Sequence, residues 1–238
     1  SLSLTWKLTG GDREGTCVLA AYYELAEDAR LHVSRLESGL TKTIIYDQRH
    51  SVLAARARAD FYAAELGGEK IIVHSYGKLS GDASEMNERA IYAGRGRQHL
   101  DFFYHIDHVG KKTKAEIDLK GALADESKKI FRGTLDFKRG CAGSVGDEGD
   151  FAIQLDPKTK NISLPLLLCT EDDVQGNHAS SAGQLDQNTI YFLMSRGFTL
   201  EEARRIVVEA LIRPIIDGMD EALREEVLNA VRMKLDRE

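Results

Sequence analysis

The sequence predicts a mainly β fold followed by a small α-helical region, and three observations carry this prediction. Short β-type segments recur roughly every 10 to 15 residues from about residue 16 to about residue 175. No helical pattern lies between them, which argues against a doubly wound α/β sheet. After Asp186 the spacing of apolar residues becomes helical. We therefore expect a β core domain over residues 1–185 and a helical C-terminal domain over residues 186–238.

The β segments show the alternation typical of strands with one buried and one solvated face. In His99–His108, apolar side chains occupy every second position, and Asp101, His105 and Asp107 share the opposite face. Some ten such segments are compatible with a sandwich, a barrel or a solenoid. The expected strands are Val18–Leu25, Leu31–Leu36, Lys42–Asp47, Arg58–Tyr62, Lys70–Ser75, Arg89–Tyr92, His99–His108, Lys114–Leu119, Lys129–Phe137 and Phe151–Leu155.

Three helices are expected after the β region. Asp186 can cap the first, which would end at Gly197 in a left-handed terminal residue. Thr199 and Glu202 form a capping box for the second, and we expect that helix to bend or break before Pro214. The third begins near Asp220 and carries an apolar stripe every four residues. This much apolar surface predicts that the helices dock on the β domain or on a partner.

Composition excludes several classes of protein. Thirty-two Lys and Arg against 38 Asp and Glu give a net charge of −6, which disfavours nucleic-acid binding. No window has the roughly 20 apolar residues of a membrane span, and the first residues do not follow the plan of a signal peptide, so a cytoplasmic protein is expected. Cys17, Cys141 and Cys169 form no Cys-x-x-Cys pair, which predicts reduced thiols rather than disulfides.

Residues able to carry chemistry are few. The sequence has no nucleophile elbow, P-loop, dinucleotide fingerprint or His-Glu-x-x-His motif. His105 and His108 fall on opposite faces of their strand, so they cannot share a metal ion. Asp101, His105 and Asp107 line one face as a metal or acid/base row, or as an ordinary polar face. The run Cys169–His178 holds the densest set of metal-ligand side chains, and a hydrogen-bonded junction is the alternative.

An ordered set of short motifs resembles the SufB/SufD family of iron-sulfur cluster assembly scaffolds. The resemblance is good over roughly the last 130 residues. Over the first hundred residues it rests only on the similar character of the expected strands. The motifs are Phe131-Arg132-Gly133, Cys141-Ala142-Gly143, Pro165, Asp172-Asp173-Val174, His178-Ala179, Leu185-Asp186, the run Tyr191–Gly197, and Glu201-Glu202-Ala203.

This resemblance implies a right-handed parallel β-helix followed by a helical C-terminal domain, with no enzymatic activity. Family members pair through the β-helix, so a dimer with a second copy or a SufB/SufD-like paralogue is expected. They bind the ABC-type ATPase SufC through the C-terminal helices, which predicts a partner-binding surface at Leu200, Ala203, Ile206, Val207 and Leu211. No other cofactor is implied beyond a transient iron-sulfur cluster at a subunit interface.

Position by position, His178 resembles the family's interface histidine and is the expected iron or cluster ligand. Gly176 stands where SufD-like members have a cysteine, and Ala179 stands where SufB-like members have a glutamate. The chain alone is therefore not expected to assemble a cluster. Family members commonly have an N-terminal helical region, and relative to them this sequence resembles a short form.

Two other functions remain open at this point. The protein could be a regulatory subunit of an ATPase with no cluster role, which the residues Gly176 and Ala179 favour. It could also be a β-solenoid enzyme acting on polysaccharide, since stacked strands can line a groove with carboxylates. Against the enzyme, aromatic residues make up only 7% and Trp6 is the single tryptophan.

Overall fold

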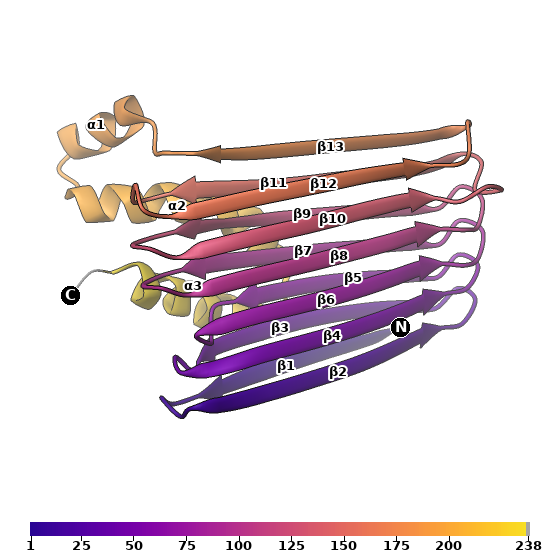
Figure 1. Ribbon diagram of the computed structural model, residues 1–238, viewed down its shortest axis with the longest axis horizontal. Helices are drawn as coiled ribbons and strands as arrows, with labels where there is room; N and C mark the ends of the chain where they lie inside the picture. Colours follow the sequence, from indigo (N-terminus) through magenta and orange to yellow (C-terminus); the bar gives the residue numbers. More distant parts are fainter. Residues whose placement is uncertain (237–238) are drawn as a thin grey trace.

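The computed structural model describes residues 1–236 and shows a parallel β-solenoid followed by three helices (Figure 1). The chain alternates between two stacked sheets, so that each coil contributes one strand to each sheet. Every pairing within the two sheets is parallel. Of the three β architectures left open by strand spacing, the solenoid is confirmed.

Sheet A has seven strands and sheet B has six. In order across sheet A they are β1 (Leu2–Gly10), β3 (Arg30–Gly39), β5 (Arg58–Glu65), β7 (Glu85–Gly94), β9 (Lys114–Leu123), β11 (Ser144–Gln154) and β13 (Val174–Gly183). In order across sheet B they are β2 (Gly15–Leu25), β4 (Thr43–Leu53), β6 (Lys70–Leu79), β8 (His99–His108), β10 (Lys128–Phe137) and β12 (Lys160–Cys169).

All ten expected strands are present, and the β region extends beyond them at both ends. The additional strands are β1, β12 and β13. The second half of the run Cys169–His178, where the sequence predicts no strand, belongs to β13. β13 is not among the expected strands because it is rich in Gly, Ser and Ala and has no apolar alternation; its backbone is held by pairing with β11.

The space between the sheets is filled by alternate side chains of each strand. Phe102, Phe131 and Tyr104 lie in this core, each less than 2% exposed. Substantial charge is buried there as well. Arg49 Nη2 lies 2.7 Å from Asp47 and 2.8 Å from Glu65, and Arg35 lies 2.8 Å from Asp47. Burial, together with the neighbouring Glu65 and Asp47, raises the pKa of Glu37 to about 10.

The helices are α1 (Gln187–Ser195), α2 (Leu200–Gly218) and α3 (Glu221–Leu235). Asp186 caps α1, the Thr199–Glu202 capping box begins α2, and Asp220 caps α3, as the sequence predicts. The sequence predicts a bend or a break before Pro214; the break does not occur, since α2 continues through this residue. The residues around Pro214, among them Ile212, Ile215 and Ile216, are buried, and this packing holds the helix together across a missing hydrogen bond.

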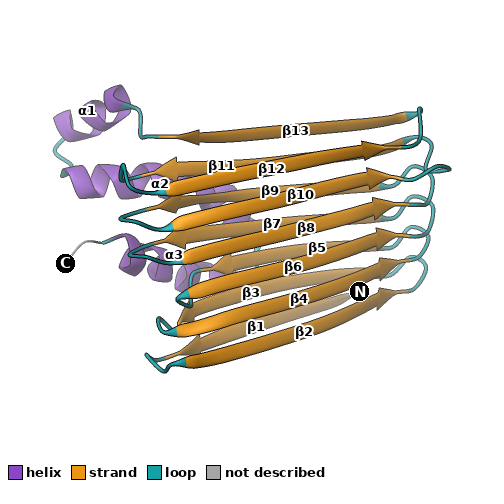
Figure 2. Cartoon of the chain, viewed as in Figure 1, coloured by secondary structure: helices purple, strands orange, loops and turns teal. Residues whose placement is uncertain are grey.

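Helices α2 and α3 dock on the outer face of sheet A, over the carboxyl halves of its strands (Figure 2). Leu36, Ala64 and Ile91 of the sheet pack with Ile212 and Leu223 of the helices in a second apolar core. The predicted docking of the helical region is therefore on its own β domain. Gly218 ends α2 against the ring of Tyr62: a Cβ added there would lie 2.6 Å from Tyr62 Cζ.

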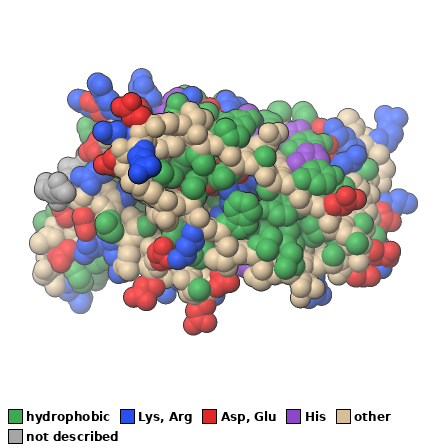
Figure 3. Space-filling model, turned by 90° about the horizontal axis from the view of Figure 1, so that it is seen from below, with side chains coloured by type: hydrophobic (Ala, Val, Ile, Leu, Met, Phe, Trp, Pro, Cys, Tyr) green, Lys and Arg blue, Asp and Glu red, His purple; other side chains and the backbone are tan. Residues whose placement is uncertain are grey.

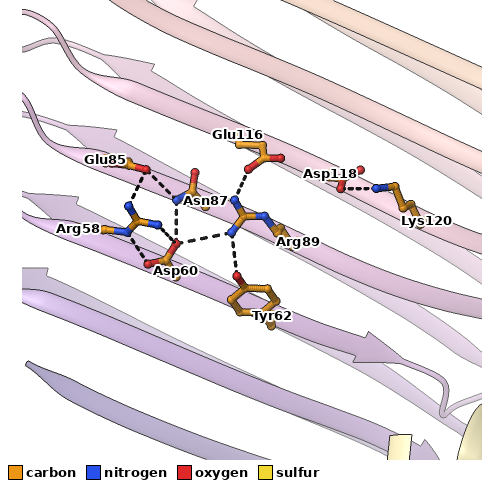
Figure 4. A network of polar contacts seen from close by, with 9 residues as sticks. All are labelled: Arg58, Asp60, Tyr62, Glu85, Asn87, Arg89, Glu116, Asp118 and Lys120. Carbon is orange, nitrogen blue, oxygen red and sulfur yellow. Dashed lines mark hydrogen bonds and ion pairs between the residues drawn. The ribbon is translucent and has the colours of Figure 1, made fainter. Parts of the chain in front are cut away.

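The uncovered amino half of this face carries a network of ion pairs between neighbouring coils (Figure 4). Arg58 Nε lies 2.7 Å from Asp60, and Arg89 donates to the Tyr62 hydroxyl at 3.1 Å and to Glu116. The other members shown are Glu85, Asn87, Asp118 and Lys120. Sheet A is thus covered by helices at one half and by paired charges at the other.

The outer face of sheet B differs. Tyr22, His50, Tyr76 and His105 stack in one row across successive strands, with ring centroids 5.0 to 5.2 Å apart. β12 adds an exposed aliphatic row of Ile162, Leu164, Leu166 and Leu168. At the end formed by β1 and β2, hydrophobic side chains also gather at the surface, and Leu2, Trp6 and Val18 are exposed there (Figure 3).

Candidate functional site

The coil formed by β12 and β13 is an open end of the solenoid. In residues 1–236, β12 pairs only with β10 and β13 only with β11. Each of these strands therefore presents one unpaired backbone edge, the arrangement that favours pairing with another chain. His178 lies in the middle of β13, so the histidine identified from sequence stands on this edge.

His178 belongs to the face of β13 that points toward the solenoid interior. In the ladder between β11 and β13, Gly176 lies beside Gly146 and His178 beside Glu148. A Cβ added at Gly176 would lie 3.1 Å from Cε2 of Phe137, which is a core residue. Since side chains two positions apart share a face, His178 also faces inward, and it is exposed because no coil of the described chain covers it.

Glu148, the ladder neighbour of His178, is a buried carboxyl group that has no hydrogen-bond partner among residues 1–236. Burial, with a contribution from Asp150, raises its pKa to about 8. Gly133 on β10 makes room for it, since a Cβ there would lie 2.5 Å from the Glu148 carboxyl carbon. Asp150 is instead paired with Lys129, which also donates to the Tyr92 hydroxyl at 3.1 Å. A neutral acid and an ion pair thus lie just inside the open end.

Two of the three cysteines lie near the open end of the solenoid, and the third lies at the opposite end. Cys169 ends β12 and is exposed, whereas Cys141 is buried in the turn before β11. Burial raises the pKa of the Cys141 thiol, and the nearby Glu171 and Cys169 raise it further. Cys17 is on β2, at the opposite end of the solenoid. Cys169 is therefore the exposed thiol of the coil that carries His178.

Acidic residues between Cys169 and His178 accept hydrogen bonds that stabilise the turn between β12 and β13. Glu171 accepts hydrogen bonds from the backbone N–H of Gly140 at 2.8 Å and of Asp172 at 3.1 Å. The carbonyl of Asp173 accepts one from Gly143 N–H at 2.6 Å. These contacts match the hydrogen-bonded junction that was the alternative to metal binding. Within residues 1–236, His178 does not belong to a group of three metal-ligand side chains.

An aspartate of the next coil lies beside the polar residues on the outer face of β8. His105 and Asp107 lie with Asp136 of β10 in one group, with ligand atoms within 4.8 Å of one another. Asp101 is instead paired with Arg132. His108 is on the opposite face, as predicted: it is buried, stacks on Phe137 at 4.3 Å and bonds Thr113 at 2.7 Å. Burial lowers the pKa of His108 to about 4.

The residues expected to bind a partner differ in accessibility. Leu200 is 40% exposed, Ile206, Val207 and Leu211 are partly buried, and Ala203 is fully buried. Ala203 therefore offers no side-chain surface to a partner in this conformation.

The sequence predicts only one residue, Leu200, of a large exposed apolar surface on the helical region. It is formed by α1 and the turn after it, and we refer to it as the α1 patch: Tyr191, Phe192, Met194, Phe198 and Leu200. Tyr191 alone is 76% exposed. Figure 1 shows α1 at the end of the molecule near β13, next to the start of α2. The signal was in the sequence, as two aromatic residues followed by Leu and Met on a nine-residue helix.

In residues 1–236, no helix has the length and apolar content that a membrane crossing requires.

Comparison with known proteins adds a family to this geometry. A family model described as "SUF system FeS cluster assembly, SufBD core domain" matches residues 4–211. The chain is 26% identical over 204 residues to the iron-sulfur cluster assembly protein SufD of Bacillus subtilis, covering 85% of this chain and 46% of that protein. It is 20% identical over 210 residues to SufD of Escherichia coli, covering 87% and 50%.

A third relative is the iron-sulfur cluster assembly protein SufB of Bacillus subtilis, which is 21% identical over 189 residues and is covered over 40% of its length. The chain thus spans about half the length, or less, of these relatives. Similarity extends to SufD-like and SufB-like proteins alike.

Proposed function

Because the chain belongs to the SufBD core family of iron-sulfur cluster assembly proteins, we propose that it is a non-catalytic scaffold of the Suf system. It pairs through the open end of its solenoid with a second copy or a SufB/SufD-like paralogue. It holds a SufC-like ABC-type ATPase through its helical region. A transient iron-sulfur cluster forms at the paired interface, with His178 as one ligand.

The observation that carries this proposal is the position of His178 on an unpaired strand edge. Pairing at β12 and β13 would satisfy exposed backbone groups and cover inward-facing side chains. It would also bring a second set of ligands to His178, which has no group of three ligand side chains within residues 1–236. A cluster needs about four ligands, so the paired interface is the natural place to assemble them.

The ATPase contact is proposed at the α1 patch together with the accessible parts of α2. Buried apolar anchors supply most of the binding energy of protein interfaces, and exposed Tyr191 and Phe192 are of that type. Leu200, a member of the patch, begins α2, and Ile206, Val207 and Leu211 extend the patch along that helix. The rest of α2 and α3 is committed to sheet A and anchors the contact to the solenoid.

Reconstitution tests the cluster role. The protein, with and without its Suf partners, is incubated anaerobically with ferrous iron and sulfide, and the visible absorption of the product is measured. We expect His178→Ala to lower the cluster signal and His99→Ala, a histidine on sheet B, to leave it unchanged. An identical spectrum for His178→Ala would remove His178 as a ligand.

A pull-down tests the ATPase contact. Truncation of the helices would expose the apolar outer face of sheet A, so point substitutions are preferable. We expect Tyr191→Asp combined with Phe192→Asp to abolish capture of the SufC-like ATPase. Met233→Asp, at an equally exposed apolar residue on α3, serves as the control. Undiminished capture by the double variant would contradict the proposed surface.

A regulatory subunit of an ATPase, with no cluster role, is the second candidate. The lack of a three-ligand group at His178 favours it, as do Gly176 and Ala179. Under this alternative the pull-down succeeds, and no cluster forms in reconstitution with any partner. A polysaccharide-acting enzyme has no support in the family to which the chain belongs.

A further inference from the structure

A compact group of metal-ligand side chains lies on the outer face of sheet B, apart from the edge that carries His178. His105 and Asp107 lie two residues apart on β8, and Asp136 stands directly beside Asp107 on β10. Their ligand atoms all lie within 4.8 Å of one another. We propose that His105, Asp107 and Asp136 bind a first-row divalent cation.

The two carboxylates lie side by side, and the counter-charge that contacts both is one partly exposed lysine. Like charges directly opposite each other on neighbouring strands destabilise a sheet. Both side chains are about nine-tenths buried, which weakens solvent screening of their repulsion. Lys138, in the turn after β10, contacts Asp136 and lies 3.4 Å from Asp107. Its side chain is 44% exposed, so it can swing into solvent when a cation enters.

The imidazole is already oriented toward the carboxylates. His105 Nε2 lies 3.0 Å from Asp107 Oδ1, and its ring stacks on Tyr76 with centroids 5.2 Å apart. The Tyr76 hydroxyl in turn donates to Asp107 Oδ2. Such contacts to the ligands fix their rotamers, as the groups around established metal sites do. A second lysine, Lys78, stands beside Asp107 on β6.

The ligand set determines the class of ion. One imidazole nitrogen and two carboxylates suit Mn²⁺, Fe²⁺ or Zn²⁺. Ligand atoms around a tetrahedral ion of this class lie roughly 3.4 Å apart. Closing the group around an ion therefore requires side-chain rotations that move the ligand atoms by about an ångström. Solvent would complete the coordination from the exposed side. This site depends neither on pairing of the solenoid nor on a cluster at His178.

Titration with Mn²⁺ alone tests the proposal, because this ion prefers nitrogen and oxygen ligands and avoids the exposed thiol of Cys169. Binding is read from the loss of the electron paramagnetic resonance signal of free Mn²⁺. We expect one saturable site in the wild-type protein. Asp136→Asn should weaken it more than about tenfold, since even residues that only support a ligand change affinity by about 10- to 100-fold.

Two further variants separate coordination from damage to the fold. Lys138→Met should tighten Mn²⁺ binding several-fold, because it removes the competing ammonium; a misfolded protein would not show this gain. Asp101→Asn, on the same face of β8, should leave binding unchanged. Absence of saturable binding in the wild type, equal affinity for Asp136→Asn, or weaker binding for Lys138→Met would each overturn the proposal.

Discussion

The two outer faces of the solenoid are built from strands of the same kind but are covered in different ways. Sheet A is covered by α2 and α3 over the carboxyl halves of its strands and by paired charges over the rest. Sheet B has no helix of residues 1–236 packed on it and carries stacked rings and an aliphatic row. Apolar surface on sheet A therefore stabilises this chain, whereas apolar surface on sheet B contributes little until another molecule covers it.

The largest expected effect separates buried from exposed leucines. Leu223→Ala empties a fully buried position between α3 and sheet A and should lower the free energy of unfolding by about 2 to 5 kcal/mol. Leu166→Ala on the exposed row of β12 should change it by less than about 0.5 kcal/mol. Urea unfolding monitored by circular dichroism measures both. Equal losses would show that sheet B is covered in solution, by dimerisation for example.

A smaller effect is expected where α2 approaches sheet A. Gly218→Ala places a methyl group against the Tyr62 ring, 2.6 Å from Cζ, and should cost about 1 to 3 kcal/mol. Gly183→Ala on β13 has no atom within 4 Å of the added Cβ and is the matched control. Thermal unfolding of the two variants compares them. A stable Gly218→Ala protein would mean that the end of α2 can lift from the sheet.

The smallest effect concerns the paired charges of sheet A. Burial raises the pKa of Asp60, but hydrogen bonds from Arg58 and Asn87 outweigh it, and the net pKa is lowered. Asp60 therefore stabilises the fold above its unfolded pKa of about 3.9, and this contribution is lost as pH falls through the lower folded pKa. Asp60→Asn should destabilise the protein by about 1 kcal/mol at pH 7.

Because the contribution of Asp60 depends on ionisation, the difference between Asp60→Asn and wild type should shrink as pH falls below 4. It should also shrink in 1 M salt, because the carboxylate is partly exposed. Urea unfolding at pH 7 and at pH 3 provides the measurement. A difference independent of pH would assign the effect to lost packing rather than to charge.

Local sequence rules predicted much of the fold. His99–His108 was predicted with its observed bounds because its alternation is strong, and Thr199 with Glu202 located the start of α2. β13 was not predicted because its β conformation depends on pairing with the neighbouring strand. The helix does not break at Pro214 because packing on sheet A outweighs the loss of one hydrogen bond.

For the candidate sites too, the sequence predicted local features and not contacts between coils. His178 was predicted as a ligand from the family resemblance and stays a prediction, and of the α1 patch only Leu200 was predicted although the other residues lie close to it in sequence. Contacts between coils were beyond local rules: Asp101 meets Arg132 31 residues later, and Asp136 meets Asp107 in the same way. Such pairs depend on the length of each coil, which alternation within one strand does not reveal.

The one-dimensional order of strands in each sheet has a consequence for local opening. Each strand forms backbone hydrogen bonds only with its neighbours along the axis, so we expect β1, β2, β12 and β13 to detach without disturbing the middle of the stack. Backbone amide exchange with deuterated water should then be fastest at both extremities and slowest near β6 and β7. A partner protein bound at one end of the solenoid would slow amide exchange at that end alone. The exchange rates would then differ between the two ends.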